Sequence, residues 1–181
     1  MIFQQDKAQI FGQAQSVKLL LLDVDGILTD GKLYVGETGE QFKAFNTLDG
    51  HGIKQLQKAG IQVGIISGRD SAALLHRASE LGINLLYRGR EDKSAVLREI
   101  TANLELEENE IAYAGDDLPD LAVIDRVGLG ISVPNAHPEV RNAADMLTEN
   151  PGGEGAVREI CDFLLQANGL YDQIIIDSLG Q

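Results

Sequence analysis

Residues 17–30 read VKLLLLDVDGILTD, an apolar run that ends in two aspartates separated by one residue. The run predicts a buried strand, and side chains two positions apart in an extended chain point to the same side. We therefore expect Asp23 and Asp25 to share one pocket at the carboxyl end of this strand, where open α/β sheets bind ligands. Two carboxylates so close together need a cation between them or a proton on one of them. A bound cation or a protonated carboxylate at this place could each take part in catalysis.

Beyond this stretch, short apolar runs alternate with amphipathic helical patterns. Further strands are expected near 61–66, 83–87, 111–114 and 127–131, and helices near 50–59, 71–81, 92–103, 118–124, 138–143 and 155–168. Residues 32–45 hold two short alternating runs around glycines, which predicts a β-hairpin. The alternation of strands and helices is typical of an α/β, doubly wound fold with a mainly parallel sheet covered on both faces.

The chain length of 181 residues favours one domain, which we expect over 17–168. A glutamine-rich N-terminal extension at 1–16 is expected to be loosely held, and a C-terminal tail covers 169–181. Neither a secretory signal nor an apolar run of transmembrane length is expected from the sequence. Cys161 is the single cysteine and is expected in the core, which suits a cytoplasmic protein in a reducing compartment.

The formal net charge of −13 argues against nucleic acid or an acidic membrane surface as a partner. An anionic small-molecule substrate would need positive charge concentrated at the site. A divalent metal and a few arginine or lysine side chains can supply that charge.

Polar residues follow three of the expected strands, at 23–30, 67–69 and 115–120. Lys93 begins a helix between the second and third clusters. Because the carboxyl ends of neighbouring parallel strands lie together, these clusters are expected to converge. Together the clusters supply two aspartates, a hydroxyl, a cation and a further acidic pair. This set of groups suits phosphoryl transfer.

In order and content the clusters resemble the four motifs of the haloacid dehalogenase-type phosphohydrolases. The Asp-x-Asp-Gly-x-x-Thr motif matches 23–29, and the hydroxyl motif matches Ser67 after its apolar strand. The helix-leading lysine matches Lys93, and Gly-Asp-Asp-x-x-Asp matches 115–120. The resemblance implies the Rossmann-like fold of that family.

The resemblance also implies a role for the acidic residues. Asp23 would be the nucleophile and form an aspartyl-phosphate. Asp25 would protonate the leaving oxygen and then activate the hydrolytic water. Mg²⁺ would be the cofactor, held by the side chains of Asp23 and Asp116 and by the backbone carbonyl of Asp25.

Four further residues of the motifs take supporting roles by the same resemblance. Ser67 and Lys93 would hold the phosphoryl oxygens. Asp117 and Asp120 would orient Lys93 and the water around the metal rather than bind the metal directly.

Within this family the chain resembles the 3-deoxy-D-manno-octulosonate 8-phosphate phosphatases, which act in lipopolysaccharide precursor synthesis. The resemblance rests on residues 23–30, 45–50, 67–69 and 152–159 and covers about 17–168. It implies a phosphorylated sugar acid as substrate. The expected substrate-binding residues are Asn46, Asp49, Gly50, Lys54, Arg69 and Arg77. Leu48 stands where those enzymes often have arginine, which keeps open a related substrate such as a nonulosonate 9-phosphate.

The spacing of the motifs leaves no room for a cap domain. The stretch from Thr29 to Ser67 holds a hairpin and one helix, and the stretch from Ser67 to Lys93 holds one helix and one strand. A site without a cap is open to water unless a neighbouring subunit covers it. The similar enzymes are tetramers built through this hairpin, so a homotetramer is expected, with the tail after Gly169 over a neighbour's site.

Two other classes of protein have related features. A signalling receiver domain also uses an acceptor aspartate, an acidic pair, a hydroxyl, a lysine and Mg²⁺, but its acidic pair comes first along the chain. Here the pair at 116–117 comes after the other clusters. A non-catalytic scaffold of this fold would be marked by loss of Asp23 or Asp25, and both are present.

Overall fold

The computed structural model describes residues 1–37 and 39–180, and these residues form a seven-stranded sheet with the order β1-β9-β8-β7-β2-β5-β6. The strands are β1 (Ile2–Phe3), β2 (Leu19–Leu22), β5 (Gln62–Ile66), β6 (Leu85–Tyr87), β7 (Ile111–Ala114), β8 (Leu129–Ser132) and β9 (Met146–Leu147). Five of the six pairings are parallel, and β1 joins β9 antiparallel. The expected mainly parallel α/β sheet is confirmed.

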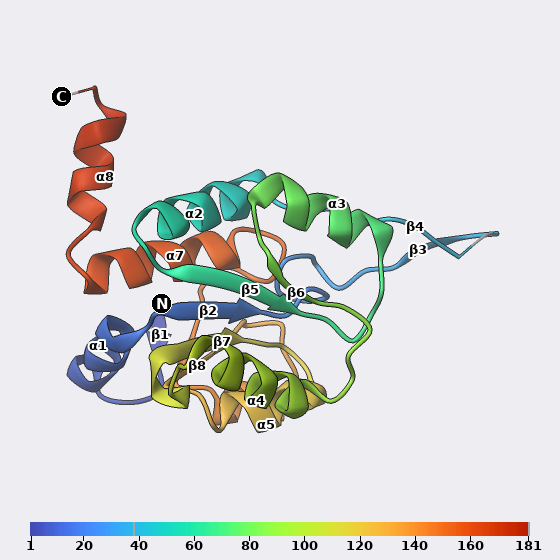
Figure 1. Cartoon of the computed structure of the whole chain (residues 1–181), viewed down its shortest axis with the longest axis horizontal. Helices are drawn as coiled ribbons and strands as arrows, with labels where there is room; N and C mark the ends of the chain where they lie inside the picture. The colour runs from blue at the N-terminus through green and yellow to red at the C-terminus, as the bar shows by residue number, and fades with distance from the viewer. Residues whose placement is uncertain (38, 181) are drawn as a thin grey trace.

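Helices cover both faces of this sheet (Figure 1). The helices and 3₁₀ turns are α1 (Lys7–Ser16), α2 (Thr47–Lys58), α3 (Ala72–Leu81), α4 (Lys93–Leu104), η1 (Glu108–Glu110), η2 (Leu118–Asp120), α5 (Leu121–Ile124), α6 (Pro138–Ala143), α7 (Ala156–Ala167) and α8 (Tyr171–Ser178). One core lies under α1, α2, α3 and α7, and the other lies under α4, α5 and α6.

The central strand β2 shows why the first apolar run folds as it does. All four of its leucines are fully buried. Leu20 and Leu22 pack into one core, while Leu19 and Leu21 pack into the other. Because side chains alternate along a strand, only a strand covered on both faces can bury four consecutive leucines. Parallel pairing with β5 and β7 then brings the carboxyl ends of the three strands together.

A β-hairpin leaves the body of the molecule between β2 and α2 (Figure 1). It consists of β3 (Tyr34–Gly36) and β4 (Gly39–Phe42), within the expected range of 32–45. The rings of Tyr34 and Phe42 stack with centroids 4.5 Å apart, and Val35 is 70% exposed. Between β2 and β5 the described residues form only this hairpin and α2, so they build no cap domain.

The expectation that the N-terminal residues are loosely held is wrong. Strand β1 pairs with β9, and Ile10 and Ala14 of α1 are fully buried. Phe3, Phe11 and Phe163 pack together, with ring centroids 5.2 to 6.4 Å apart. Aromatic packing of this kind stabilises the join between the N-terminal segment and α7.

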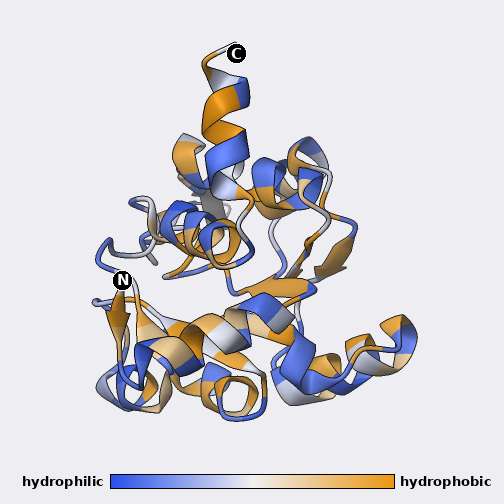
Figure 2. Ribbon diagram, turned by 90° about the vertical axis from the view of Figure 1, so that its left-hand side faces the viewer, coloured by the Kyte–Doolittle hydropathy of each residue, from blue (hydrophilic) through white to orange (hydrophobic). Residues whose placement is uncertain are grey.

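The C-terminal tail contains a helix that the sequence did not predict. Helix α8 projects from the end of α7, and both hydrophobic and hydrophilic residues lie along its exposed length (Figures 1 and 2). Ile175 and Ile176 are among its exposed hydrophobic residues. Among the described residues, no helix is both long and apolar enough to cross a membrane.

Candidate active site

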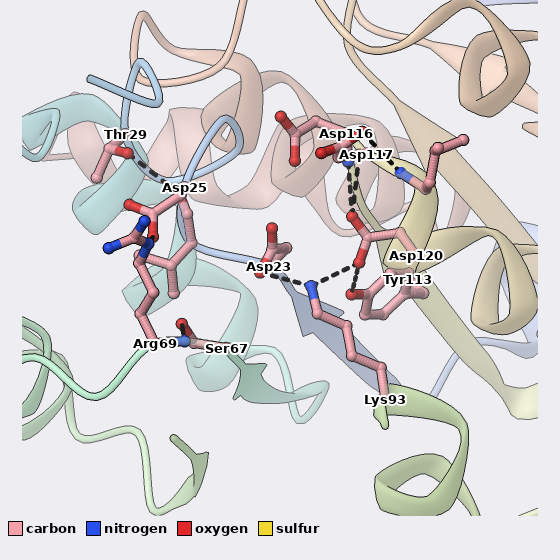
Figure 3. A network of polar contacts seen from close by, with 12 residues as sticks. Asp23, Asp25, Thr29, Ser67, Arg69, Lys93, Tyr113, Asp116, Asp117 and Asp120 are labelled. Carbon is pink, nitrogen blue, oxygen red and sulfur yellow. Dashed lines mark hydrogen bonds and ion pairs between the residues drawn. The ribbon is translucent and has the colours of Figure 1, made fainter. Parts of the chain in front are cut away.

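The carboxyl ends of β2, β5 and β7 open into a cavity of about 490 Å³. It is lined by Asp23, Asp25, Gly31, Leu33, Ser67, Gly68, Arg69, Glu91, Lys93, Asp116, Asp117, Pro119 and Asp120. Figure 3 shows side chains from all four predicted motifs gathered there. The structure therefore brings together the residues that the sequence assigned to phosphoryl transfer.

Buried polar contacts fix Lys93 at the centre of the site. Its Nζ lies 2.8 Å from Asp23 Oδ1 and 2.6 Å from Asp120 Oδ1 (Figure 3). Asp92 caps the helix that Lys93 begins, because its side chain accepts a hydrogen bond from Ala95 N at 2.9 Å. The helix start thus holds the ammonium against two carboxylates.

Both carboxylate oxygens of Asp120 are held by contacts with neighbouring groups. Besides Lys93, its Oδ1 accepts a hydrogen bond from Tyr113 Oη at 2.5 Å. Its Oδ2 accepts from the backbone N–H groups of Asp116 and Asp117, at 3.0 and 3.2 Å. Its oxygens are therefore used in orienting Lys93 and the 115–117 turn.

The loop after β2 requires glycine at position 26. Gly26 has φ of +94°, and a Cβ on it would lie 1.9 Å from Asp116 Oδ2. Thr29 closes the loop by donating to Val24 O at 3.3 Å and accepting from Gly31 N at 3.2 Å. The first and fourth motifs can approach each other only because no side chain stands between them.

Negative charge at the site exceeds the positive charge that faces it. Burial raises the pKa of Asp23 to about 6, with Lys93 opposing the rise and Asp120 adding to it. Burial, together with the neighbouring Asp23, Asp120 and Asp117, raises the pKa of Asp116 to about 8. Groups with such shifts mark a place where a bound cation would relieve repulsion.

The donor set fits a hard divalent cation. Carboxylate oxygens of Asp23, Asp116 and Asp120 lie within 4.8 Å of one another. Because Asp120 already serves four donors, Asp23 and Asp116 are the carboxylates that remain to hold an ion. The Asp116 carboxylate accepts no hydrogen bond from any residue in the described part of the chain. An oxygen-only set of this kind suits Mg²⁺.

The second aspartate of the first motif meets two cations. Asp25 Oδ1 lies 2.5 Å from Lys43 Nζ, and Asp25 Oδ2 lies 3.8 Å from Arg69 Nε. Arg69 was expected at the site, whereas Lys43 was missed because it follows the hairpin and belongs to none of the motifs. The hairpin returns to the carboxyl end of β2, and this return places Lys43 beside Asp25.

Ser67 follows β5 and is almost fully buried at the cavity wall. Its N–H donates to Tyr87 O at 2.8 Å, and its Oγ accepts from Arg69 N at 3.2 Å. Because the Ser67 oxygen accepts this hydrogen bond, the hydrogen of its hydroxyl group is available for donation to an anionic oxygen.

The other expected substrate-binding residues gather around the start of α2, outside the residues that line the cavity. Asn46 caps α2 by accepting from Leu48 N at 2.8 Å. Arg77 donates to Asn46 O at 3.3 Å, and a Cβ on Gly50 would lie 2.2 Å from Arg77 Nη2. Lys54 is exposed on the same helix. In this chain the contacts of Asn46, Gly50 and Arg77 hold the helix start together.

Asp49, also on α2, is buried and caps a different helix. Its Oδ1 accepts a hydrogen bond from Arg158 N in the first turn of α7, at 2.8 Å. Gly152 and Gly153, just before α7, pack against the loop after β2, and Gly153 N donates to Ile27 O at 3.0 Å. The 152–155 turn thus supports the loop that carries the two aspartates.

The chain is similar in sequence and in fold to known proteins. Residues 86–160 match the family model of the haloacid dehalogenase-like hydrolases. The chain is 43% identical over 166 residues to the 3-deoxy-D-manno-octulosonate 8-phosphate phosphatase of Escherichia coli K12, covering 92% of this chain and 88% of that relative. The Moraxella catarrhalis enzyme of the same name, solved with magnesium, phosphate and KDO, has a TM-score of 0.93 at 42% identity over 95% of this chain and 99% of that one. The cobalt-bound Haemophilus influenzae enzyme has a TM-score of 0.86 at 39% identity over 88% and 93%.

A doubly wound sheet with these four clusters at its carboxyl edge defines a haloacid dehalogenase-like hydrolase. Within that class, the chain belongs to the family of 3-deoxy-D-manno-octulosonate 8-phosphate phosphatases. The resemblance drawn from the motifs is confirmed. The sequence identity with these phosphatases, and the share of the chain that it covers, exclude the alternative that the chain is a signalling receiver domain.

Proposed function

We propose that this protein hydrolyses 3-deoxy-D-manno-octulosonate 8-phosphate to the free sugar acid and phosphate, using Mg²⁺, in lipopolysaccharide precursor synthesis in the cytoplasm. The observation that carries the proposal is the convergence of Asp23, Lys93 and Asp116 in one cavity of a chain that is 43% identical to such enzymes. Among the described residues, no other group of three or more acidic, histidine or cysteine side chains lies close enough together to hold a metal ion.

The two aspartates of the first motif divide the chemistry. An Asp23 carboxylate oxygen attacks phosphorus, and the bond from phosphorus to the sugar oxygen breaks. Asp25 gives a proton to that oxygen, and the sugar acid leaves. Asp25 then takes a proton from water, whose oxygen attacks the aspartyl-phosphate, so phosphate and the free Asp23 carboxylate are restored.

The surrounding residues hold the transferring group. Lys93, fixed by Asp120, and the hydroxyl of Ser67 donate to phosphoryl oxygens. Asp23, Asp116 and the backbone carbonyl of Asp25 would hold Mg²⁺, while Asp117 would orient water around it. When bound, Mg²⁺ offsets the repulsion between the anionic nucleophile and the anionic phosphate.

Arg69 is our candidate for the substrate's carboxylate or phosphate, because it lines the cavity and its side chain is exposed. Asn46, Asp49, Gly50, Lys54 and Arg77 would contribute to the substrate site from the start of α2. Leu48, 56% exposed, stands where related enzymes often have arginine. This difference favours testing a nonulosonate 9-phosphate as the alternative substrate.

We also propose a homotetramer built through the hairpin. Val35 and Phe42 expose apolar surface on a two-stranded sheet that projects from the body of the molecule, and such surface favours association with another subunit. In an assembly the hairpin and α8 would cover a neighbour's open site. Light scattering at working concentration should give four times the chain mass, and a monomer would contradict this assembly.

The function is tested with a panel of phosphorylated sugar acids, with and without Mg²⁺. We expect phosphate release to be fastest with 3-deoxy-D-manno-octulosonate 8-phosphate and to stop when the metal is chelated. Faster release from a nonulosonate 9-phosphate would assign the alternative substrate. No release from any member of the panel would reject the proposal.

A further inference from the structure

The two oxygens of the Asp25 carboxylate lie in different surroundings. Lys43 Nζ lies 2.5 Å from Oδ1, and the Lys43 side chain is only 2% exposed. Arg69 Nε lies 3.8 Å from Oδ2, and this arginine lines the open cavity. Lys43 is not among the lining residues. One oxygen is therefore tied to a buried ammonium, and the other faces the side where substrate would enter (Figure 3 shows Arg69 beside Asp25).

Burial makes the Lys43 contact a strong constraint. An ammonium removed from water is costly unless a carboxylate compensates it, so the two groups are held together far more firmly than a surface pair. Lys43 directly follows β4. The returning end of the hairpin is thereby anchored on Asp25. The Asp25 side chain is itself 23% exposed, but it cannot rotate without breaking its contact with the buried ammonium.

We propose that Lys43 is a positioning residue that holds Oδ1 of Asp25, so that Oδ2 is the oxygen that transfers the proton. The inference rests on the proposed phosphatase function. In the first step Asp23 bonds to phosphorus, the bond to the sugar oxygen breaks, and the proton on Oδ2 moves to that oxygen. In the second step a water proton moves to Oδ2, the water oxygen bonds to phosphorus, and Asp23 leaves as a carboxylate. Lys43 keeps its proton throughout.

This role predicts a dependence on the leaving group. A sugar alkoxide is a poor leaving group and needs the proton from Asp25. A 4-nitrophenolate is stable as an anion and leaves without one. The value of kcat/KM reports the steps up to phosphoryl transfer, so misplacing the acid should lower it for the sugar phosphate and largely spare it for the aryl phosphate.

The test compares Lys43→Met with wild type on both substrates in the presence of Mg²⁺. We expect kcat/KM to fall by about 10- to 100-fold for the sugar phosphate, part of the usual contribution of a general acid, and by less than about threefold for 4-nitrophenyl phosphate. Lys43→Arg, which keeps the positive charge, should recover part of the loss. Lys18→Met is the matched control, because Lys18 makes an ion pair of the same length with Glu110 but is 63% exposed and precedes β2 at the opposite end.

Equal losses on the two substrates would show that Lys43 only supports the structure, and unchanged kinetics would remove it from the mechanism. Aryl phosphate turnover also shows whether the variant site is folded. If Lys43→Met does not fold, Lys43→Gln allows the same comparison. If the wild type does not hydrolyse the sugar phosphate, the proposed function fails, and the ratio measured with any alkyl phosphate that it does hydrolyse still tests Lys43.

Discussion

The carboxylate of Asp49 in α2 caps the backbone N–H of Arg158 in α7, with Oδ1 2.8 Å from the nitrogen. The N-cap residue of α7 is Gly155, which has no side chain to accept a hydrogen bond from the first turn. An acidic group near a helix N-terminus is favourable, yet this one is almost fully buried. Helices α2 and α7 are thus joined by a carboxylate whose ionisation depends on the fold.

This contact makes stability depend on pH. Burial raises the pKa of Asp49 from 3.8 to about 6, although the hydrogen bond from Arg158 N opposes the rise. Because the folded state binds this proton more tightly than the unfolded state, Asp49 lowers the free energy of unfolding as pH rises from 3.8 to about 6. Relative to Asp49→Asn, wild type should lose on the order of 2–3 kcal/mol across this window.

Urea unfolding of both proteins in buffers spanning this window measures the difference. Asp125→Asn, at an exposed aspartate, is the control and should follow wild type. Parallel stability curves for wild type and Asp49→Asn would show that the capping carboxylate is not titrating there.

Gly26→Ala should disrupt the site through Asp116. The new methyl group would overlap the Asp116 carboxylate, and φ of +94° is unfavourable for alanine. We expect a destabilisation of about 1–3 kcal/mol and a loss of magnesium-dependent activity larger than that destabilisation explains. Magnesium titration of phosphate release measures this, with Gly60→Ala as control, since Gly60 also has positive φ but nothing within 4 Å of its Cβ position. Equal activities of the two variants would contradict the steric argument.

Tyr113→Phe should weaken the hold on Lys93. The change removes a buried hydrogen bond to Asp120 Oδ1 without altering the ring that packs in the core. Hydrogen bonds to charged groups contribute about 1.5–3 kcal/mol, so we expect a destabilisation in that range and a rise in KM as Lys93 becomes less well placed. Thermal unfolding and steady-state kinetics measure the two effects. A variant with wild-type stability would mean that Asp120 is held sufficiently by its other donors.

Magnesium should stabilise the protein more as pH rises. With the pKa of Asp23 raised to about 6 and that of Asp116 to about 8, protons compete with the metal for both carboxylates. Without metal, these raised pKa values lower stability as pH increases toward 8, and bound Mg²⁺ should reverse that loss. The melting temperature with Mg²⁺ and with a chelator, compared at pH 6 and pH 8, tests this. Asp116→Asn should abolish the shift, and an equal shift at both pH values would contradict the competition.

The sequence predicted the sheet and the motif residues because both depend on local pattern. Four buried leucines must form a strand covered on both faces, and polar residues at parallel strand ends must converge. Lys43 and Tyr113 could not be assigned in this way. The role of Lys43 depends on where the hairpin returns to the sheet, and the role of Tyr113 depends on which strand residue faces Asp120. Neither contact produces a repeating pattern in the sequence.

Several elements were missed, among them β1, α1 and α8, and the reasons are related. Strand β1 has two residues, and α1 buries only Ile10 and Ala14, so neither shows a clear repeat. Helix α8 has no fully buried residue, although Tyr171 and Ile174 are partly buried against the core, so it lacks the broad apolar face that marks a helix in a sequence. The partners of the residues at the start of α2 could not be predicted for a different reason. The position of Asp49 in a helix does not reveal whether its side chain contacts substrate or another helix.

The central claim is that an Asp23 oxygen attacks phosphorus within the cluster formed by Lys93, Asp116 and Asp120. Phosphate release by Asp23→Asn, with saturating sugar phosphate and Mg²⁺, tests it most directly. The variant keeps the shape of the side chain and removes the nucleophilic oxygen anion, so turnover should fall by at least about a thousandfold while the protein stays folded. Wild-type turnover by folded Asp23→Asn would contradict the account.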